Sequence, residues 1–308
     1  MGLYRDSEYN LSRVRSATRK IHPESPVPKP SPTLASRAAG ALLGLAAGRA
    51  LARGSAPDGS LALARILAEE LAAGRRDLRE LSRRWVERAA ADAAGIDGET
   101  AAALAHLARH DEPPSRAAGQ GSEPLVRCLP VALAAFDAPR TLVSATYHVA
   151  ALTHPDPLVA WSAVAVNVAL ACFLQGKRDF VPDLVEALRN NAVPDELLSR
   201  VRHVPLRPSA GSPGGSGPEG AVGSALGSAL GDAVAALRLA YHEPVLERGL
   251  RAVAAGGPEA AARAGLVGAL LGARDSSRAI PATWTAPPEA DILGALAARL
   301  VRADTAAA

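Results

Sequence analysis

Apolar residues recur every three to four positions through most of this 308-residue chain, and charged residues fill the positions between them. This spacing is typical of helices with one buried face, and no sustained alternation of apolar and polar residues predicts a strand. We therefore expect an all-α fold, a compact multi-helix bundle. The predicted helices cover residues 34–48, 61–73, 77–91, 100–109, 126–135, 140–152, 158–174, 180–190, 195–202, 221–240, 244–255, 260–272 and 288–303.

Three glycines in the first predicted helix, Gly40, Gly44 and Gly48, are spaced four residues apart, which places them on one face. Each costs about 1 kcal/mol relative to alanine in a helix interior. Close approach of this face to the backbone of a neighbouring helix would offset that cost. A membrane-spanning pair is not expected, because Arg37 and Arg49 flank a stretch too short to cross a bilayer.

Two segments interrupt the helical pattern. Residues 1–33 combine scattered arginines with closely spaced prolines, and residues 205–220 are rich in Pro, Gly and Ser. Such segments bury too little apolar surface to offset the entropy lost on ordering them. We expect a disordered N-terminal tail at 1–33 and a single all-α domain at 34–304 with a flexible insertion at 205–220. The alternative for the tail is an Arg-rich arm that docks on a protein partner.

Composition supports the helical prediction: 48% of the residues are hydrophobic but only 3% are aromatic, so alanine, leucine and valine supply most of the apolar mass. The formal net charge is +3, and acidic and basic residues are interleaved, as in 75–88. Nucleic-acid binding is therefore not expected. Cys128 and Cys172 lie far apart in apolar runs, which indicates buried thiols in a reducing compartment.

The apolar run 158–174 is at the short end for a membrane span and contains Ser162 and Asn167, so a buried central helix explains it better. The N-terminal residues are polar and charged, without the apolar core of a signal peptide. We expect a cytoplasmic protein that does not associate with a membrane.

Several short motifs follow one another along residues 34–302. They are residues 40–48, Asp92-Ala-Ala-Gly95 with Thr100 and Leu104, Gly119-Gln120-Gly121-Ser122 with Arg127-Cys128-Leu129-Pro130, Leu152-Thr153-His154-Pro155-Asp156-Pro157, and residues 268–272 with Ile280-Pro281 and Trp284. Together and in this order they resemble the ADP-ribosylglycohydrolase family, which includes the dinitrogenase-reductase-activating glycohydrolases and the J1 crystallins. The resemblance implies an all-α domain that binds two Mg²⁺ ions, which hold an ADP-ribose and activate water to cleave its glycosidic bond.

The chain departs from the family at the acidic positions that the resemblance implies for Mg²⁺. The family's Thr-Asp-Asp-Thr reads Pro57-Asp58-Gly59-Ser60, its Asp-x-Asp-Thr aligns with Glu259-Ala260-Ala261-Ala262, and its Gly-Asp-Ala reads Gly48-Arg49-Ala50. Mg²⁺ needs several oxygen ligands, and Asp58 and Glu259 are the remaining metal candidates. Asp58 has the alternative role of a helix N-cap, and Glu259 that of a first-turn acid.

The candidate ligand-binding residues are Gln120, Gly121, Ser122 and His154. Glycine-rich loops present backbone N–H groups to anions, so this loop would contact a phosphate or ribose, although a plain turn explains it equally well. His154 either lines the cleft or is a structural group at a helix start. Thr153 and Asp156 have capping-box spacing, in which Asp156 is a capping acid rather than a base.

We therefore expect a catalytically degenerate ADP-ribosylglycohydrolase-like protein with a binding or regulatory role through the inherited cleft. Its expected ligand is ADP-ribose or a related nucleotide, and no cofactor is expected. One alternative is an active hydrolase that uses Mg²⁺ to remove ADP-ribose from a modified protein or small molecule. Another is a structural or interaction protein. No Ser-His-Asp or Cys-His spacing stands out, so no catalytic residue is assigned.

Overall fold

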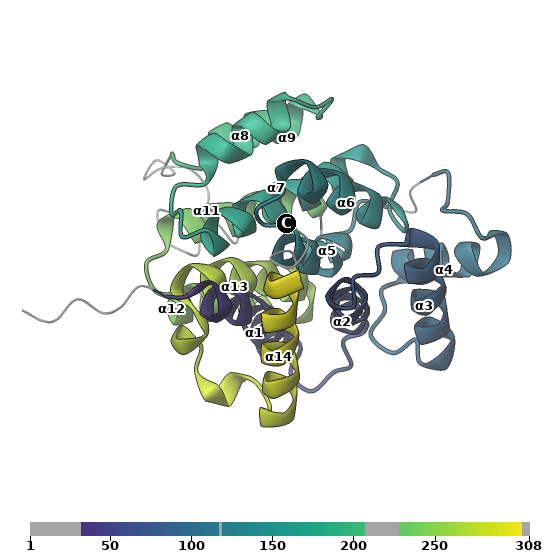
Figure 1. Ribbon diagram of the computed structural model, residues 1–308, viewed down its shortest axis with the longest axis horizontal. Helices are drawn as coiled ribbons and strands as arrows, with labels where there is room; N and C mark the ends of the chain where they lie inside the picture. Colours follow the sequence, from purple (N-terminus) through teal and green to yellow (C-terminus); the bar gives the residue numbers. More distant parts are fainter. Residues whose placement is uncertain (1–31, 117–118, 207–227, 304–308) are drawn as a thin grey trace, which may run out of the picture. The chain divides into compact units, whose positions relative to one another are not determined.

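Helices form the regular structure of the described residues, which are 32–116, 119–206 and 228–303 of the computed structural model (Figure 1). The α-helices are α1 (Leu34–Arg53), α2 (Gly59–Ala72), α3 (Leu78–Ala91), α4 (Gly98–His110), α5 (Glu123–Ala134), α6 (Pro139–Ala151), α7 (Pro157–Leu174), α8 (Val181–Arg189), α9 (Asp195–Arg202), α11 (Ala229–His242), α12 (Leu246–Ala254), α13 (Ala261–Asp275) and α14 (Pro287–Ala303). Three short 3-10 helices are η1 (Gly257–Ala260), η2 (Ser277–Ala279) and η3 (Ala282–Trp284). Within those ranges the only strand-like pairing is an isolated bridge between Gly121 and Ser228, so the all-α prediction is confirmed.

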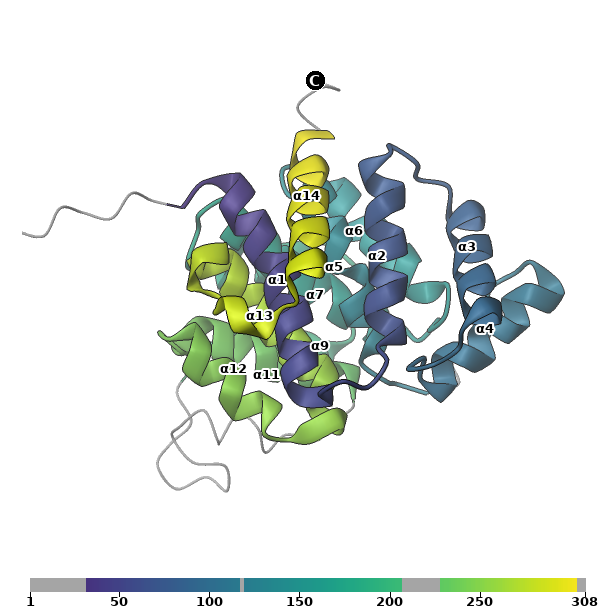
Figure 2. The ribbon, with the colours of Figure 1, turned by 90° about the horizontal axis from the view of Figure 1, so that it is seen from below.

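The glycine face of α1 lies directly against α13. A Cβ atom on Gly44 would stand 2.0 Å from the backbone oxygen of Gly268, and one on Gly40 would stand 2.1 Å from that of Gly272. The contact is reciprocal, because a Cβ on Gly268 would stand 1.9 Å from the oxygen of Gly44. The predicted close approach of the first helix to a neighbouring backbone is therefore confirmed. Both views of the ribbon show the two helices side by side (Figures 1 and 2).

Helix α7 is the centre of the core and packs against α5, α6, α11 and α13. It is long and apolar enough to cross a membrane by length and composition alone, but 89% of it is buried inside the protein. Burial of that kind is found in the core helices of soluble proteins, and it confirms the prediction of a central helix. Within it, Asn167 donates to the backbone oxygen of Cys128 at 2.8 Å and to Thr146 Oγ1 at 2.9 Å, which satisfies its buried amide nitrogen.

The remaining helices cover this core. Helix α14 lies against α1, α2 and α5, the α3–α4 pair continues outward from α2, and α8 and α9 pack on α7 (Figures 1 and 2). The interleaved charges predicted for an exposed helix face form surface ion pairs, such as Arg83 with Glu80. Cys128 and Cys172 are free, buried thiols, as predicted.

Carboxylates cap several helices at their N-termini. Asp58 accepts a hydrogen bond from the N–H of Leu61, and Asp156 accepts one from the N–H of Leu158. The capping roles predicted for both aspartates are confirmed. Thr153 was assigned to the same capping box, but this is wrong: α7 begins only after Asp156, and the Thr153 hydroxyl is used by a buried arginine described below.

Two predicted segments lie mostly outside the described residues. The tail at 1–33 is described only at Pro32 and Thr33, and Thr33 caps α1 through a hydrogen bond from Ser36. The insertion at 205–220 is described only at its first two positions. The predicted division into tail, single domain at 34–304 and insertion therefore stays a prediction.

Candidate functional site

Arg49, one turn from the end of α1, is a buried arginine with two carboxylate partners. Its side chain is 1% exposed. Its Nε and Nη2 donate to Asp58 Oδ2 and Oδ1 at 2.5 and 2.8 Å. Glu123, the first residue of α5, places Oε2 3.0 Å from Nη1 and Oε1 3.3 Å from Nη2. We call this arrangement of one guanidinium between two carboxylates the Arg49 cluster.

The segment before α2 is folded so that one carboxylate serves two purposes. Asp58 Oδ1 accepts the Leu61 N–H at 3.0 Å while the same group binds Arg49. The segment after α3 also holds this turn in place, because the Gly59 N–H donates to the Gly95 oxygen at 3.1 Å. Gly95 adopts φ +73°, a conformation that favours glycine. Burial alone would lower the pKa of Arg49, but Glu123 and Asp58 outweigh burial and raise it, so the guanidinium stays charged.

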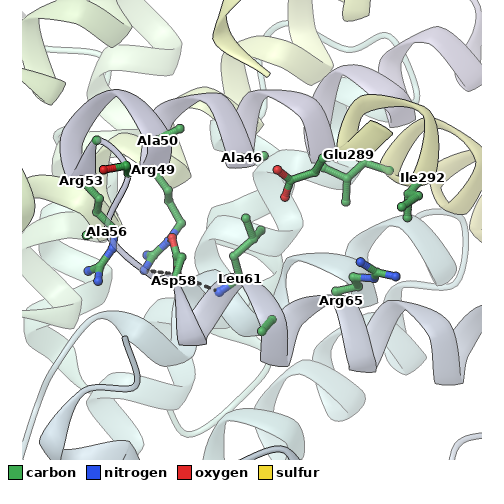
Figure 3. Close-up of a pocket in the computed structure, with 14 residues that line it drawn as sticks. Ala46, Arg49, Ala50, Arg53, Ala56, Asp58, Leu61, Arg65, Glu289 and Ile292 are labelled. Atoms are coloured by element: carbon green, nitrogen blue, oxygen red, sulfur yellow. Dashed lines mark hydrogen bonds and ion pairs between the residues drawn. The ribbon is translucent and has the colours of Figure 1, made fainter. Parts of the chain in front are cut away.

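A cavity of about 360 Å³ opens beside the Arg49 cluster and is lined by α1, α2 and α14. Figure 3 shows Arg49 and Asp58 toward one end of it and Glu289 and Ile292 toward the other. Arg65 also lines the cavity and is paired with Glu69, 3.0 Å from its Nε. Since both signs of charge line the wall and these arginines have carboxylate partners, the cavity does not by itself favour an anion or a cation.

A second polar group lies around Glu99, in the first turn of α4. Glu99 Oε2 accepts the Gly121 N–H at 3.0 Å and lies 3.1 Å from His154 Nε2. A Cβ on Gly119 would stand 1.8 Å from Glu99 Oε1, so this loop position has room for the carboxylate only because it carries no side chain. The predicted residues Gly121 and His154 therefore meet, and the group between them is one that the sequence analysis did not select.

Arg127, on α5, belongs to the polar group around Glu99, which it reaches through Thr153 and His154. It is 1% exposed, donates to Thr100 Oγ1 at 2.8 Å and to Thr153 Oγ1 at 2.5 Å, and lies 4.0 Å from Asp97 Oδ2. Burial lowers the pKa of Arg127, and the charge of Asp97 offsets this only in part. For Asp97 itself, burial works to raise the pKa, but Thr100 and Arg127 outweigh it and leave the pKa below its ordinary value.

The other predicted loop residues are Gln120 and Ser122. Gln120 donates through Nε2 to Asp156 Oδ2 at 2.8 Å, and its backbone oxygen accepts the Ala229 N–H at 2.8 Å. Ser122 is buried at the N-terminus of α5. All four candidate ligand-binding residues thus lie in one region, where the start of α5 meets the segment before α7. Their role in binding stays a prediction.

The comparisons with known proteins agree with this architecture. A family model described as ADP-ribosylglycohydrolase matches residues 30–308. The chain belongs to the ADP-ribosylglycohydrolase family. A solved structure titled "ADP-ribosylglycohydrolase-related protein complex" is similar to it with a TM-score of 0.70 and 24% identity, over 87% of this chain and 98% of that one. At that identity the likeness shows the fold, and no curated protein matches the chain.

The residues of this family member do not fit a pair of Mg²⁺ ions at the positions that the family resemblance implies. Position 49 carries a guanidinium that already binds Asp58, and Glu259 is exposed on η1. Ala261 and Ala262 are buried methyl groups without an oxygen donor. Mg²⁺ dehydrates reluctantly and requires several protein oxygens, which these positions do not supply.

Elsewhere in the described ranges, one group of potential metal ligands comes together, Asp97, Glu99 and His154, with one ligand atom from each within 4.8 Å of the others. Arg127 places a fixed positive charge 4.0 Å from Asp97, which opposes a cation there. Asp97 and Glu99 were missed by sequence analysis, although their position around the start of α4 is the usual one for capping and first-turn acids.

Proposed function

We propose that this ADP-ribosylglycohydrolase family member is not a hydrolase and instead binds ADP-ribose or a related nucleotide without a divalent cation, in a regulatory role. The observation that carries the proposal is the Arg49 cluster. In it, a side chain of the protein supplies the positive charge beside Asp58, where relatives would need bound metal. The family membership supports ADP-ribose as the ligand class.

A covalently attached guanidinium differs from a metal ion in two ways that matter for catalysis. It has no open coordination position, so it cannot bind a water molecule and lower the pKa of that water. It also cannot leave when a chelator is added, because it is part of α1. A site built in this way is expected to hold ligand with the same affinity at any Mg²⁺ concentration.

Calorimetric titration of the full chain with ADP-ribose tests the proposal, once in EDTA and once in excess Mg²⁺. We expect the same dissociation constant in both, and no release of ADP-ribose from ADP-ribosylated arginine or serine peptides. Mg²⁺-dependent release would overturn the proposal in favour of an active hydrolase. Absence of ADP-ribose binding under both conditions would overturn it in favour of a structural or interaction protein.

Substitution of Arg49 sharpens the test. Arg49→Asp restores an acid next to Asp58 and Glu123, so Mg²⁺ should raise the melting temperature of this variant but leave the wild-type protein unchanged. Arg53→Ala, one turn further along α1, is the matched control and should not respond to Mg²⁺. A wild-type melting temperature that itself rises with Mg²⁺ would contradict the proposal even if Arg49→Asp does not fold.

A cytoplasmic location and a protein partner for the Arg-rich segment 1–33 are also part of the proposal. They rest on the sequence alone. Deleting residues 1–31, which precede the N-cap of α1, should leave ADP-ribose affinity and melting temperature unchanged. A loss of affinity in this deletion variant would show that the segment belongs to the ligand site and is not a separate docking arm.

A further inference from the structure

The carboxylate of Glu99 lies directly against the loop formed by residues 119–122. A Cβ at Gly119 would stand 1.8 Å from Oε1, and one at Gly121 would stand 2.7 Å from Oε2. Both glycines are therefore required for the carboxylate to sit where it does. The loop that sequence analysis assigned to anion binding thus already holds an anion, and that anion belongs to the chain itself.

Two N–H donors hold the Glu99 carboxylate, and both converge on Oε2. The backbone of Gly121 donates at 3.0 Å, and His154 Nε2 lies at 3.1 Å. Glu99 Oε2 accepts the Gly121 N–H, and an oxygen that acts as an acceptor requires a donor from the ring, so the proton of the neutral imidazole is on Nε2. Burial and the nearby Arg127 lower the pKa of His154 below its ordinary value, which keeps the ring neutral.

A chain of hydrogen bonds sets the direction of the His154 donor. Arg127 cannot accept a hydrogen bond, so its Nη2 donates to Thr153 Oγ1 at 2.5 Å. The Thr153 hydroxyl is then free to donate to His154 Nδ1, 3.1 Å away, which leaves the Nε2–H facing the loop. His154 is 1% exposed and cannot turn its ring toward solvent. The buried network therefore holds a fixed donor aimed at an oxyanion.

Glu99 is the solvent-exposed partner in this contact. Its side chain is 36% exposed, whereas the imidazole that it meets is buried. It projects from the first turn of α4, and rotation about its side-chain bonds moves the carboxylate into water without moving the helix. Asp97 does not compete for the loop, because its Oδ1 caps the N–H of Thr100 at 2.8 Å and its Oδ2 faces Arg127.

We propose that Glu99 is an intramolecular occupant of an oxyanion site formed by Gly121 and His154, and that a phosphate group of the ligand binds by displacing its carboxylate. This inference rests on the proposed function for the identity of the ligand as a nucleotide, but not for the site itself. The contact is autoinhibitory: affinity for phosphate groups is limited by competition with a carboxylate that is always present.

Pyrophosphate titrations of Glu99→Ala and Glu99→Gln test this inference without using ADP-ribose or turnover. Removing the competing carboxylate should tighten pyrophosphate binding by about ten-fold or more in Glu99→Ala, and the Gly121 amide resonance should shift on addition. Glu99→Gln keeps the size of the side chain but removes its charge, and it should show a smaller gain. Glu196→Ala removes an exposed glutamate from α9 and is the control, with unchanged affinity.

The double variant Glu99→Ala/His154→Ala separates the site from a general charge effect. It should lose the gain of the single variant, because the fixed donor is gone. Unchanged or weaker pyrophosphate binding in both Glu99 variants would overturn the inference, and if Glu99→Ala does not fold, Glu99→Gln decides. Mg²⁺-dependent turnover by the wild-type protein would overturn the proposed function and leave this result unaffected.

Discussion

Gly44→Ala should destabilise the protein, although alanine is the better helix former. The added Cβ would lie 2.0 Å from the oxygen of Gly268 and 2.6 Å from its carbonyl carbon. Carbon–oxygen contacts between backbones are normally about 3.3 Å or longer. Helices α1 and α13 would therefore have to separate by about 1.3 Å at this point, the difference between 3.3 and 2.0 Å.

The size of this destabilisation depends on how far the surrounding structure can relax to relieve the clash. Both clashing atoms belong to helical backbones, so no change of rotamer relieves the contact, and neighbouring glycine contacts along the two helices would open with it. Overpacking of a core costs about 1–3 kcal/mol and sometimes more, and a backbone clash belongs at the upper end. Helix propensity returns about 1 kcal/mol. We expect the free energy of unfolding to fall by about 2 kcal/mol.

Urea unfolding followed by the fluorescence of the three tryptophans measures this change. Gly294→Ala is the matched control, because Gly294 is a helical glycine in α14 whose Cβ would have no atom within 4 Å. It should stabilise the protein by up to about 1 kcal/mol from propensity alone. If Gly44→Ala were as stable as wild type, or moved in the same direction as Gly294→Ala, the proposed backbone contact between α1 and α13 would be refuted.

Three further predictions concern charge and titration. Arg49→Met leaves Asp58 and Glu123 without their shared cation. Because those carboxylates are 15% and 19% exposed, the loss of unfolding free energy should be about 2–3 kcal/mol, below the 3–5 typical of full burial, as read from thermal and urea unfolding. The lowered pKa of His154 means that the unfolded state binds more protons than the folded state below about pH 7, so stability should decrease as the pH is lowered, and His154→Gln should flatten that slope. Burial raises the pKa of Cys128 to about 12 and that of Cys172 to about 11, so neither thiol should react with a disulfide reagent at pH 8 until the protein unfolds.

The helices could be predicted because their pattern is local. Apolar spacing gave their order, and capping carboxylates explain the small errors at their ends: α2 begins at Gly59 rather than at 61 because Asp58 caps it there. The glycine spacing also predicted a close helix contact. The glycine spacing could not identify α13 as the partner, because residues 40–48 carry no information about which distant segment they contact, and the partner residues 264–272 lie far away in the sequence.

The candidate site was predictable only in part, for a similar reason. The loop 119–122 and His154 could be selected from short motifs, and the missing acids could be read from the alanines at 261 and 262. Sequence could not predict two contacts, because they depend on how distant helices pack. These are the ion pair between Arg49 and Glu123 and the entry of Glu99 into the loop. Each of these residues is an ordinary charged residue in its own segment, and no spacing rule distinguishes it from its exposed neighbours.

The pairing of α1 with α13 has a consequence for how the chain is made. Ser36 and Ser277, whose hydroxyl oxygens lie 3.2 Å apart next to this contact, are 241 residues apart in sequence. At a synthesis rate of about 5–20 residues per second, roughly 12–48 s pass between their emergence from the ribosome. Throughout that interval the glycine-lined, apolar surface of α1 lacks its packing partner, α13. We therefore expect nascent chains to depend on a chaperone that shields this surface until translation reaches the final helices.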